Sequence, residues 1–221
     1  MQYERPDPKY ERVATIDIET TAINPADGEL VAIGIGVHDR GDAASEVTYD
    51  LAYRTGDDEA TLVNRAIERL STADPDLVVS YNGAEFDVPF MRGRCTAHDS
   101  SFPETILTDP DSHLDLMAAR KRLARRTDRR YPSLEACLGS YGYEPAKTVW
   151  KGEVVTNRRF GEELGPAYLG TLAEGDTEQI GHLQNVIDHY LVTDLEATLS
   201  VYYHDVGVSF EPQYSGTVTE F

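Results

Sequence analysis

The sequence has few cysteines, no long hydrophobic run and little positive charge, and each shortage excludes a class of protein. Cys95 and Cys137 are the only cysteines, and neither stands in a CxxC or Cys/His pattern, which excludes a disulfide framework and a structural zinc site. No window approaches the roughly 18 consecutive apolar residues of a membrane-spanning helix. The polar, proline-containing first residues give no secretory signal. We therefore expect a cytoplasmic protein that does not interact with membranes.

The shortage of positive charge bears on possible partners. The chain has 20 basic and 39 acidic residues, a net charge of −19. Such a protein should repel polyanions, which on its own argues against nucleic acid as a partner. The acids are dispersed along the chain, however, and the basic residues are 16 arginines against 4 lysines. Dispersed acidity with little lysine is typical of proteins in concentrated salt, where screening shortens repulsion to a few ångströms. We hypothesise a salt-loving (halophilic) source.

The N-terminal part of the chain predicts antiparallel strands. Apolar and polar residues alternate in RVATIDIE, which is typical of a strand with one apolar face. Gly34 and Gly36 leave one face of the next segment bare. The connections are short, so the segments should form antiparallel hairpins. These predicted strands span residues 12–19, 30–38 and about 43–52.

After Asp57 the pattern changes to helices alternating with short strands. The run LVVSY predicts a strand buried on both faces, as in parallel sheets. Predicted helices follow Asp57 and span about 87–97, 117–126, 133–141 and 177–204, predicted strands span 77–81 and 113–117, and residues 142–176 are not placed. This order predicts an α/β fold of the ribonuclease H-like type, a mixed five-stranded sheet of three antiparallel strands then two parallel, flanked by helices.

The length suits one domain of this kind. At 221 residues, a single ribonuclease H-like α/β domain over 1–221 with some insertions is expected. Its core should run from about residue 12 to 204. The tail, residues 205–221, is polar and should be poorly ordered.

DIET places two acids in the first predicted strand. Asp17 and Glu19 lie two residues apart and so share one face of the strand. Strand interiors disfavour Asp, and two neighbouring carboxylates repel each other. A divalent cation removes both objections, because Mg²⁺ and Mn²⁺ take oxygen ligands. The alternative is an edge strand with a solvated polar face.

YNGAEFDVPF, residues 81–90, places a third acid after the buried strand. An Asn–Gly pair predicts a turn, and Asp87 begins the next helix. The alternative role for Asp87 is an ordinary helix N-cap. Topology favours a binding site, because open α/β sheets bind ligands at the carboxyl ends of their central strands. Asp115, at the end of the predicted strand 113–117, is a further acid that would support the site from behind.

HYLVTDLEATLSVY, residues 189–202, places a fourth acid on the last predicted helix. Asp194 lies on or beside the apolar stripe, and Tyr190 is one turn before it on the same face. A carboxylate that faces a sheet needs a partner, since a buried unpaired charge is costly. That partner is a metal or, in the alternative interpretation, an arginine.

Together these segments resemble the three exonuclease motifs of the DEDD superfamily. DIET is similar to the first, YNGAEFDVPF to the second and Tyr190 to Asp194 to the third, and the resemblance covers about residues 12–203. The second motif is especially similar to that of the proofreading exonuclease domain of family-B DNA polymerases and of related stand-alone exonucleases. The chain has no room for a polymerase domain, so the resemblance implies a separate nuclease or a subunit.

The third motif fits two branches of that superfamily. One branch has Tyr four residues before the last Asp, which Tyr190 matches, and the other has His five residues before it, which His189 matches. On a helix, four residues return to within about 40° of Asp194, whereas five end about 140° away. We therefore predict Tyr190 as the site residue, the pattern called DEDDy, and His189 as a surface histidine.

The resemblance implies two-metal hydrolysis of phosphodiester bonds in single-stranded nucleic acid. Asp17, Glu19, Asp87 and Asp194 would hold two divalent cations, Mg²⁺ or Mn²⁺, with Asp17 bridging them. Tyr190 would orient the attacking water, because tyrosine is a poor base at neutral pH. Family precedent implies 3′→5′ removal of nucleotides, with DNA favoured. The sequence identifies no particular replication or repair protein as a partner.

A protein this acidic needs a local positive surface to hold a polyanion. RKRLARRTDRR, residues 120–130, has seven basic residues in eleven and predicts a phosphate-contacting face, with Arg125 and Arg126 among its contacts. The alternative is a solvated helix whose arginines balance the acidic surface. Asn82 and Phe86 are further candidates to contact the substrate, Phe86 by stacking on a base.

Two other functions remain open at this point. A ribonuclease that trims RNA 3′ ends uses the same site, since contacts to the 2′-hydroxyl separate the two substrates. The second is a non-catalytic module that binds nucleic acid or a partner protein. Such modules tend to lose the acids, whereas all four acids and the tyrosine are present here.

Overall fold

The main sheet has five strands in the order β3-β2-β1-β4-β5 in the computed structural model, which describes residues 1–56 and 58–221. The strands are β1 Arg12–Thr20, β2 Leu30–Asp39, β3 Thr48–Tyr53, β4 Leu77–Ser80 and β5 His113–Asp115. β2 is antiparallel to both β1 and β3, whereas β4 is parallel to both β1 and β5. The predicted order of three antiparallel strands and then two parallel ones is confirmed.

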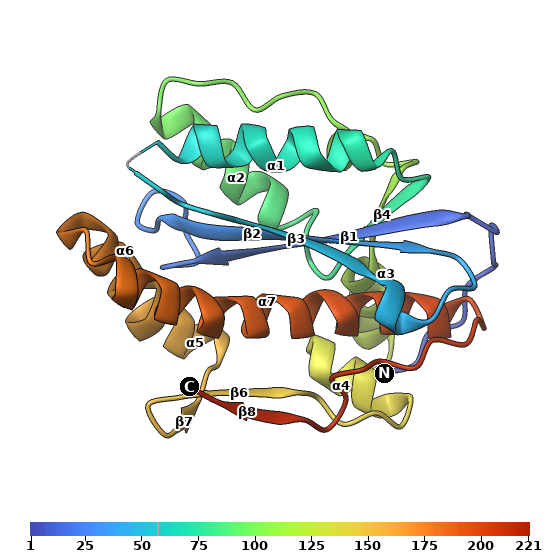
Figure 1. Cartoon of the computed structure of the whole chain (residues 1–221). Helices are drawn as coiled ribbons and strands as arrows, with labels where there is room; N and C mark the ends of the chain where they lie inside the picture. Colours follow the sequence, from blue (N-terminus) through green and yellow to red (C-terminus); the bar gives the residue numbers. More distant parts are fainter. Residues whose placement is uncertain (57) are drawn as a thin grey trace.

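Helices cover both faces of this sheet (Figure 1). On one face lie α1, Glu59–Ala73, and α2, Asp87–Ala97, and along the other runs the long helix α7, Thr177–Asp205. Ile16 and Ile18 of β1 are buried with side chains of α1 and α2. Because side chains alternate along a strand, Asp17 and Glu19 point to the opposite face, toward α7. β1 therefore separates an apolar layer from a layer that contains carboxylates.

Gly34 brings α7 unusually close to the sheet. Gly34 pairs with Asp17 in the β1–β2 ladder. A Cβ atom at Gly34 would lie 2.8 Å from Cδ1 of Leu195, so only glycine lets α7 pack at this distance. This close approach lies beside Asp17. It brings α7, which carries Asp194, against β1.

The tail is ordered, so the expectation for residues 205–221 was wrong. Three short strands form a second sheet, β7-β6-β8, beyond α7 in Figure 1: β6 Lys147–Trp150, β7 Glu153–Val154 and β8 Val218–Glu220. The buried carboxylate of Glu196 accepts hydrogen bonds from the backbone N–H groups of Gln213 and Tyr214, at 2.8 and 2.9 Å. This anchor and the parallel pairing of β8 with β6 hold the tail against α7.

The remaining elements refine several boundaries. They are α3 Leu116–Arg126, α4 Leu134–Ser140, α5 Asn157–Arg159, a π-helical turn Phe160–Leu164, α6 Gly165–Glu174, and 3-10 turns at Ala44–Glu46 and Ile106–Thr108. The third strand begins at residue 48 rather than 43, because the 3-10 turn comes first. Asp57, where a helical pattern was expected to begin, lies outside the described residues. Among the described helices, none combines the length and apolarity needed to cross a membrane.

Candidate metal centre

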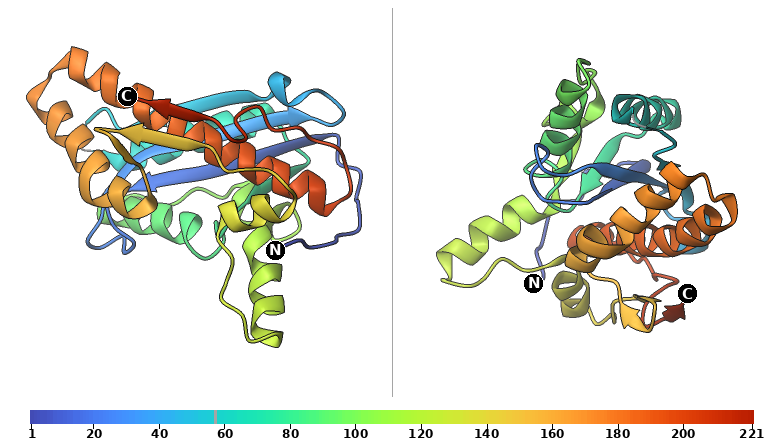
Figure 2. Two further views of the ribbon diagram at one scale, coloured as in Figure 1. Left: turned by 90° about the horizontal axis from the view of Figure 1, so that it is seen from below. Right: turned by 90° about the vertical axis from the view of Figure 1, so that its left-hand side faces the viewer.

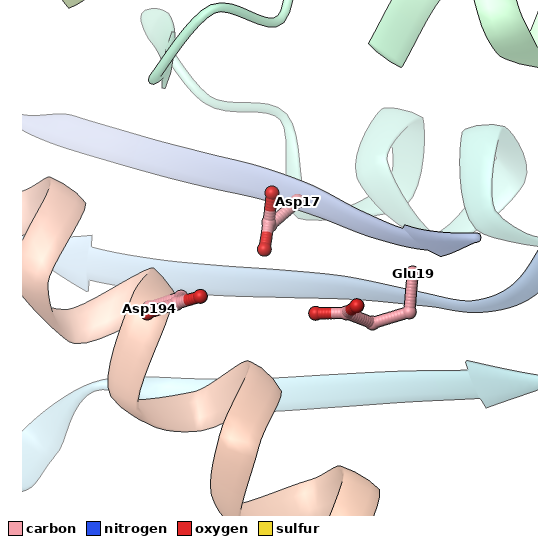
Figure 3. Close-up of side chains that lie close together, drawn as sticks. All are labelled: Asp17, Glu19 and Asp194. Carbon is pink, nitrogen blue, oxygen red and sulfur yellow. The ribbon is translucent and has the colours of Figure 1, made fainter. Parts of the chain in front are cut away.

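Three carboxylates from two elements converge between β1 and α7 (Figure 3). Asp17 and Glu19 come from β1, and Asp194 comes from α7. Each offers one carboxylate oxygen, and these oxygens all lie within 4.8 Å of one another. The side chains point toward a common space, which is an arrangement that suits a cation with oxygen ligands.

The fourth predicted acid, Asp87, is the first residue of α2 and only 3% exposed. The N-cap position of α2 is Phe86, and Oδ2 of Asp87 is buried without a hydrogen-bond partner among the described residues. A Cβ at Gly83 would lie 3.0 Å from that Oδ2, so the turn before α2 closes over the carboxylate. The N-cap interpretation of Asp87 therefore does not account for its burial.

Burial and mutual repulsion raise the pKa of all four carboxyl groups. For Asp17, burial and then the charge of Asp87 raise the pKa well above its usual value. For Glu19 and Asp194, burial is again the main cause, and Asp17 adds to it in both. Burial and then Asp115 raise the pKa of Asp87 to about 8. No cationic side chain in the described part of the chain opposes these shifts.

This electrostatic state fits a divalent cation better than an ion pair. The alternative partner for Asp194, an arginine, does not occur among the described residues: no salt bridge reaches any of the four carboxylates there. Buried anions without a compensating charge are costly. Oxygen-only ligand sets are those preferred by Mg²⁺ and Mn²⁺. The residues present therefore match the chemistry of the expected metal site.

Tyr190 lies one helical turn before Asp194 and faces the same space. It is 8% exposed, and its hydroxyl donates a hydrogen bond of 2.7 Å to Oδ1 of Asn157. Its ring stacks on Phe160, with centroids 5.7 Å apart. Burial, followed by the charge of Asp194, raises the pKa of Tyr190 well above 10. The phenol is therefore neutral, and its proton is directed toward Asn157.

His189 is not a surface histidine, contrary to the prediction. It is half-buried, its Nδ1 lies 2.7 Å from Oγ1 of Thr148, and its ring contacts Tyr214 and Phe221. The small sheet and the tail cover this face of α7, and the sequence had given no reason to place them there. The prediction that His189 points away from Asp194 is nevertheless correct, because its ring faces β6 and the end of the chain after β8.

A pocket of about 310 Å³ opens beside Asp194 and Tyr190. It is lined by α4, by the loop into β6, by the segment after β7 and by α7; its polar lining includes Glu135, Lys147, Thr148, Thr156, Asn157 and Asp194. Glu135 also raises the pKa of Asp194, after burial and Asp17. Sequence reasoning missed both Glu135 and Asn157. The only local signal near Asn157 is Thr156, a residue type that favours helix N-caps.

The loop before α2 ties the second motif to α3. Asn82 has a positive φ of 74°, and its N–H donates to Oδ1 of Asp115 at 2.9 Å. The ammonium group of Lys121 donates to the side-chain oxygen of Asn82. Asp115 also caps α3 through the N–H of Met117 at 2.8 Å. Asn82 therefore shapes the turn, and Asp115 holds the loop and helix together behind Asp87.

The other predicted substrate contacts differ in exposure. Phe86 precedes α2, is half-buried and lies against the core residue Phe90, with ring centroids 5.7 Å apart. Arg125 and Arg126 are exposed at the end of α3. The structure brings neither arginine into the group of carboxylates, which is formed by β1, α2 and α7.

Comparisons with known proteins match this chain to a protein family and to solved structures. Residues 14–202 match the RNase_H superfamily. The chain is similar in fold to the family B DNA polymerase from the hyperthermophilic archaeon Pyrobaculum calidifontis, with 15% identity and a TM-score of 0.59 over 92% of this chain and 25% of the polymerase. It thus spans about a quarter of that polymerase. E. coli Exonuclease I in complex with a dT13 oligonucleotide matches at 15% identity and a TM-score of 0.37, over 53% of this chain and 31% of that one.

Proposed function

The chain belongs to the RNase_H superfamily, and from this premise we propose that it is a metal-dependent 3′-5′ exonuclease acting on single-stranded nucleic acid. One observation carries the proposal: Asp17, Glu19 and Asp194 bring carboxylate oxygens within 4.8 Å of one another, the buried Asp87 adds its charge to theirs, and no described salt bridge reaches any of the four. DNA is favoured as substrate because the second motif resembles that of DNA polymerase proofreading domains. The 3′→5′ direction rests on the same resemblance.

The carboxylates divide between two cation positions. Asp17, Glu19 and Asp194, whose oxygens lie within 4.8 Å, would hold one divalent cation. Asp17 and Asp87 would hold the second. When bound, Mg²⁺ or Mn²⁺ supplies charge stabilisation to the phosphodiester and lowers the pKa of the attacking water.

Tyr190 would orient the attacking water as a hydrogen-bond acceptor. Its proton is donated to Asn157, so the lone pairs of its oxygen remain free to accept. A phenol whose pKa lies well above 10 does not act as a general base near neutral pH. Stacking on Phe160 fixes the ring and limits the hydroxyl to one position. Asn157 is thus a positioning residue for Tyr190.

Substrate contacts outside the metal centre fall on two elements. Asn82 and Phe86 flank the turn before α2, where Phe86 would stack on a base near the cleaved end. Arg125 and Arg126, at the end of α3, would contact backbone phosphates.

The experiment that tests this function compares cleavage of matched 3′- and 5′-labelled single-stranded DNA and RNA. The reactions contain Mg²⁺ or Mn²⁺ at high salt, with EDTA and the Asp17→Asn variant as controls. We expect metal-dependent shortening from the 3′ end, with DNA cut faster than RNA, and none in the variant. Folded protein that leaves every substrate intact under both metals would overturn the proposal. Faster cutting of RNA would reassign the substrate.

The acidic surface is a separate part of the proposal. A net charge of −19 with 4 lysines supports adaptation to concentrated salt. Circular dichroism and activity across a series of KCl concentrations test this. We expect loss of structure in dilute buffer, because repulsion among the acids is then unscreened. Full activity in dilute buffer would contradict it.

A further inference from the structure

The arginines of this chain divide into those that form salt bridges and those that form none among the described residues, and most of the second group lie in one place. Nine of the 16 arginines form salt bridges among the described residues: Arg5, Arg12, Arg40, Arg54, Arg69, Arg94, Arg120, Arg158 and Arg159. Of the other seven, five lie within nine residues: Arg122, Arg125, Arg126, Arg129 and Arg130. All five are exposed. Among them, Arg125 donates a hydrogen bond of 2.7 Å to the hydroxyl of Tyr131. We call residues 122–130 the arginine arm.

The arm stands on a rigid base. Arg120 is fully buried, donates to both oxygens of Asp205 and also donates to the backbone oxygen of Met1. Lys121 pairs with Glu85 at 2.7 Å. Figure 2 shows α3 and the loop after it projecting from the rest of the chain. The side chains of the arm are therefore presented outward by a fixed support.

Balancing the acidic surface does not explain these arginines. In a chain with 39 acids, the nine paired arginines show that ion pairs form readily where an arginine lies near the body. In the arm, the only acid is Asp128, and no described salt bridge includes it or the five arginines. Compensation of the helix dipole accounts for Arg125 and Arg126 at most, because Arg129 and Arg130 lie beyond the helix.

We propose that the arginine arm is a docking surface for the phosphate backbone of a nucleic acid strand, at a distance from the cleaved end. This inference rests on the proposed function for the identity of the polyanion. Guanidinium groups bind phosphate with two parallel hydrogen bonds, which is a contact that survives when salt screens longer-range attraction. Arginine rather than lysine is therefore the suitable cation for such a surface.

The position of the arm predicts a dependence on strand length. Lys121, at its base, contacts Asn82 in the loop before Asp87, so the arm begins near the metal centre and leads away from it. The 11 residues of α3 span about 16 Å. At roughly 3.4 Å per stacked nucleotide, a strand needs on the order of five nucleotides to reach from one end of α3 to the other. Short oligonucleotides would not engage the whole arm.

The test measures binding rather than cleavage, so that it does not depend on catalysis. The full chain is titrated with fluorescent oligothymidylates of about four to about 20 nucleotides in EDTA, at several KCl concentrations. The arm variant combines Arg122→Gln, Arg126→Gln and Arg130→Gln. The matched control combines Arg12→Gln, Arg69→Gln and Arg158→Gln, which removes the same charge from exposed or half-exposed salt bridges elsewhere. Circular dichroism verifies that each variant is folded.

We expect wild type and control to bind the long strand at least about tenfold more tightly than the arm variant. The slope of log affinity against log salt should become shallower by about two for the arm variant, from three lost phosphate contacts. Affinity should rise with length in wild type and control and stay nearly flat in the arm variant. This binding result would support the arginine arm even if wild-type protein showed no nuclease activity. Failure of the proposed exonuclease function and failure of the proposed docking surface are therefore distinguishable.

Three results would overturn the inference. The first is equal loss of binding in the arm variant and the control, which would assign the effect to net charge. The second is an equal loss for the shortest and longest strands, which would place the arginines at the cleaved end. The third combines two observations: oligonucleotide binding is unchanged in the arm variant, and sedimentation shows self-association of wild type and control that the arm variant has lost. The partner of the arm would then be the acidic surface of a second copy of this chain.

Discussion

Two groups of carboxylates in this protein, one fully and one largely buried, have opposite electrostatic surroundings. Asp205 is 1% exposed and accepts hydrogen bonds from Arg120, Arg5 and Tyr141. Glu59 is fully buried and accepts from Arg94, His98 and the N–H of Leu30. At the candidate metal centre, Glu19 and Asp87 are buried and Asp17 and Asp194 are partly buried, and the charged groups that shift their pKa values are all acidic: one another, Asp115 and Glu135.

We infer that this difference separates acids that stabilise the fold from acids that would bind a metal. Around Asp205 and Glu59 every buried charge is compensated within the chain, so these clusters hold elements together. At the metal centre the fold brings like charges together, at a cost in stability that the folded chain itself does not offset. Such a cost is kept where an external cation completes the site.

The largest effect should come from removing a charge at the metal centre. Asp17→Asn should lower nuclease activity by at least about a thousandfold, because several kcal/mol of metal-dependent stabilisation are lost. The same variant should not be less stable than wild type in EDTA, since it relieves repulsion. Single-turnover cleavage and urea unfolding of the same preparations measure both quantities. A large loss of stability in EDTA would place Asp17 in the structural group.

The opposite pattern is expected at the structural cluster. Asp205→Asn leaves the buried guanidinium of Arg120 without its charged partner, which should cost about 3–5 kcal/mol of unfolding free energy. Urea unfolding checks this, with Asp87→Asn as the matched variant at the metal centre. Asp87→Asn should unfold in EDTA no earlier than wild type. Similar losses in both variants would remove the distinction between the two groups.

The two groups should also respond to pH with opposite signs. The pKa of Asp87 is raised to about 8, so its neutral form stabilises the folded state at low pH. In EDTA this stability should decline as pH rises from about 4 toward 8, and Mg²⁺ should reduce the decline. Burial opposes ionisation of Glu59, but hydrogen bonds from Arg94, Leu30 and His98 outweigh it and lower its pKa.

The stability that Glu59 contributes is therefore present above its unfolded pKa and is lost as pH falls through the lower folded value. Urea midpoints over a pH series, with Asp87→Asn and Glu59→Gln beside wild type, separate the two slopes. Asp87→Asn should flatten the decline above pH 4, and Glu59→Gln should flatten the loss in acid. Identical profiles for both variants would contradict the assignment.

A smaller effect is expected at Asn157, which acts on the metal centre through Tyr190. Asn157→Ala removes the acceptor of the Tyr190 hydroxyl and should lower kcat by about fivefold, with KM nearly unchanged, because one hydrogen bond of roughly 1 kcal/mol is lost. Asn185→Ala, on the exposed side of the same helix as Tyr190, serves as control. The effect of Asn157→Ala should disappear in a Tyr190→Phe background. An equal effect in both backgrounds would show that Asn157 acts by another route.

The smallest effect should follow disruption of an exposed ion pair. Arg158 and Glu162 pair one turn apart with side chains 82% and 61% exposed. Arg158→Gln should leave the urea midpoint indistinguishable from that of wild type, because solvent screens the pair. If Arg158→Gln lowered stability as much as Asp205→Asn does, the contribution of an ion pair to stability would depend on its being formed and not on its burial.

The main sheet and the acids of the metal centre were predictable because their signals are local. Alternation in RVATIDIE placed Asp17 and Glu19 on one face, and helical periodicity placed Tyr190 and Asp194 together. Both patterns repeat over a few residues and follow directly from backbone geometry. The parallel position of β4 could be inferred from its continuous apolar run.

The rest depends on contacts between distant parts of the chain. β6 pairs with β8, in which Lys147 lies opposite Val218, and no local pattern in either segment indicates that partner. Asn157 is 33 residues from Tyr190 in the sequence, and its short helix has too few residues for a periodic signal. The burial of His189 was not predicted for the same reason, because the small sheet that covers it was not predicted. Tertiary pairing of short segments was thus the limit of sequence reasoning.

The single long helix α7 has a consequence for how this chain can change in evolution. Asp194, at the metal centre, and Asp205, at the buried cluster with Arg120, are 11 residues apart on α7. Eleven residues make about three turns, so both project from nearly the same side of the helix. Inserting or deleting one residue between them would rotate one relative to the other by about 100°. The length of this stretch is therefore constrained, and because residues 195–203 are all buried, its side chains are constrained as well.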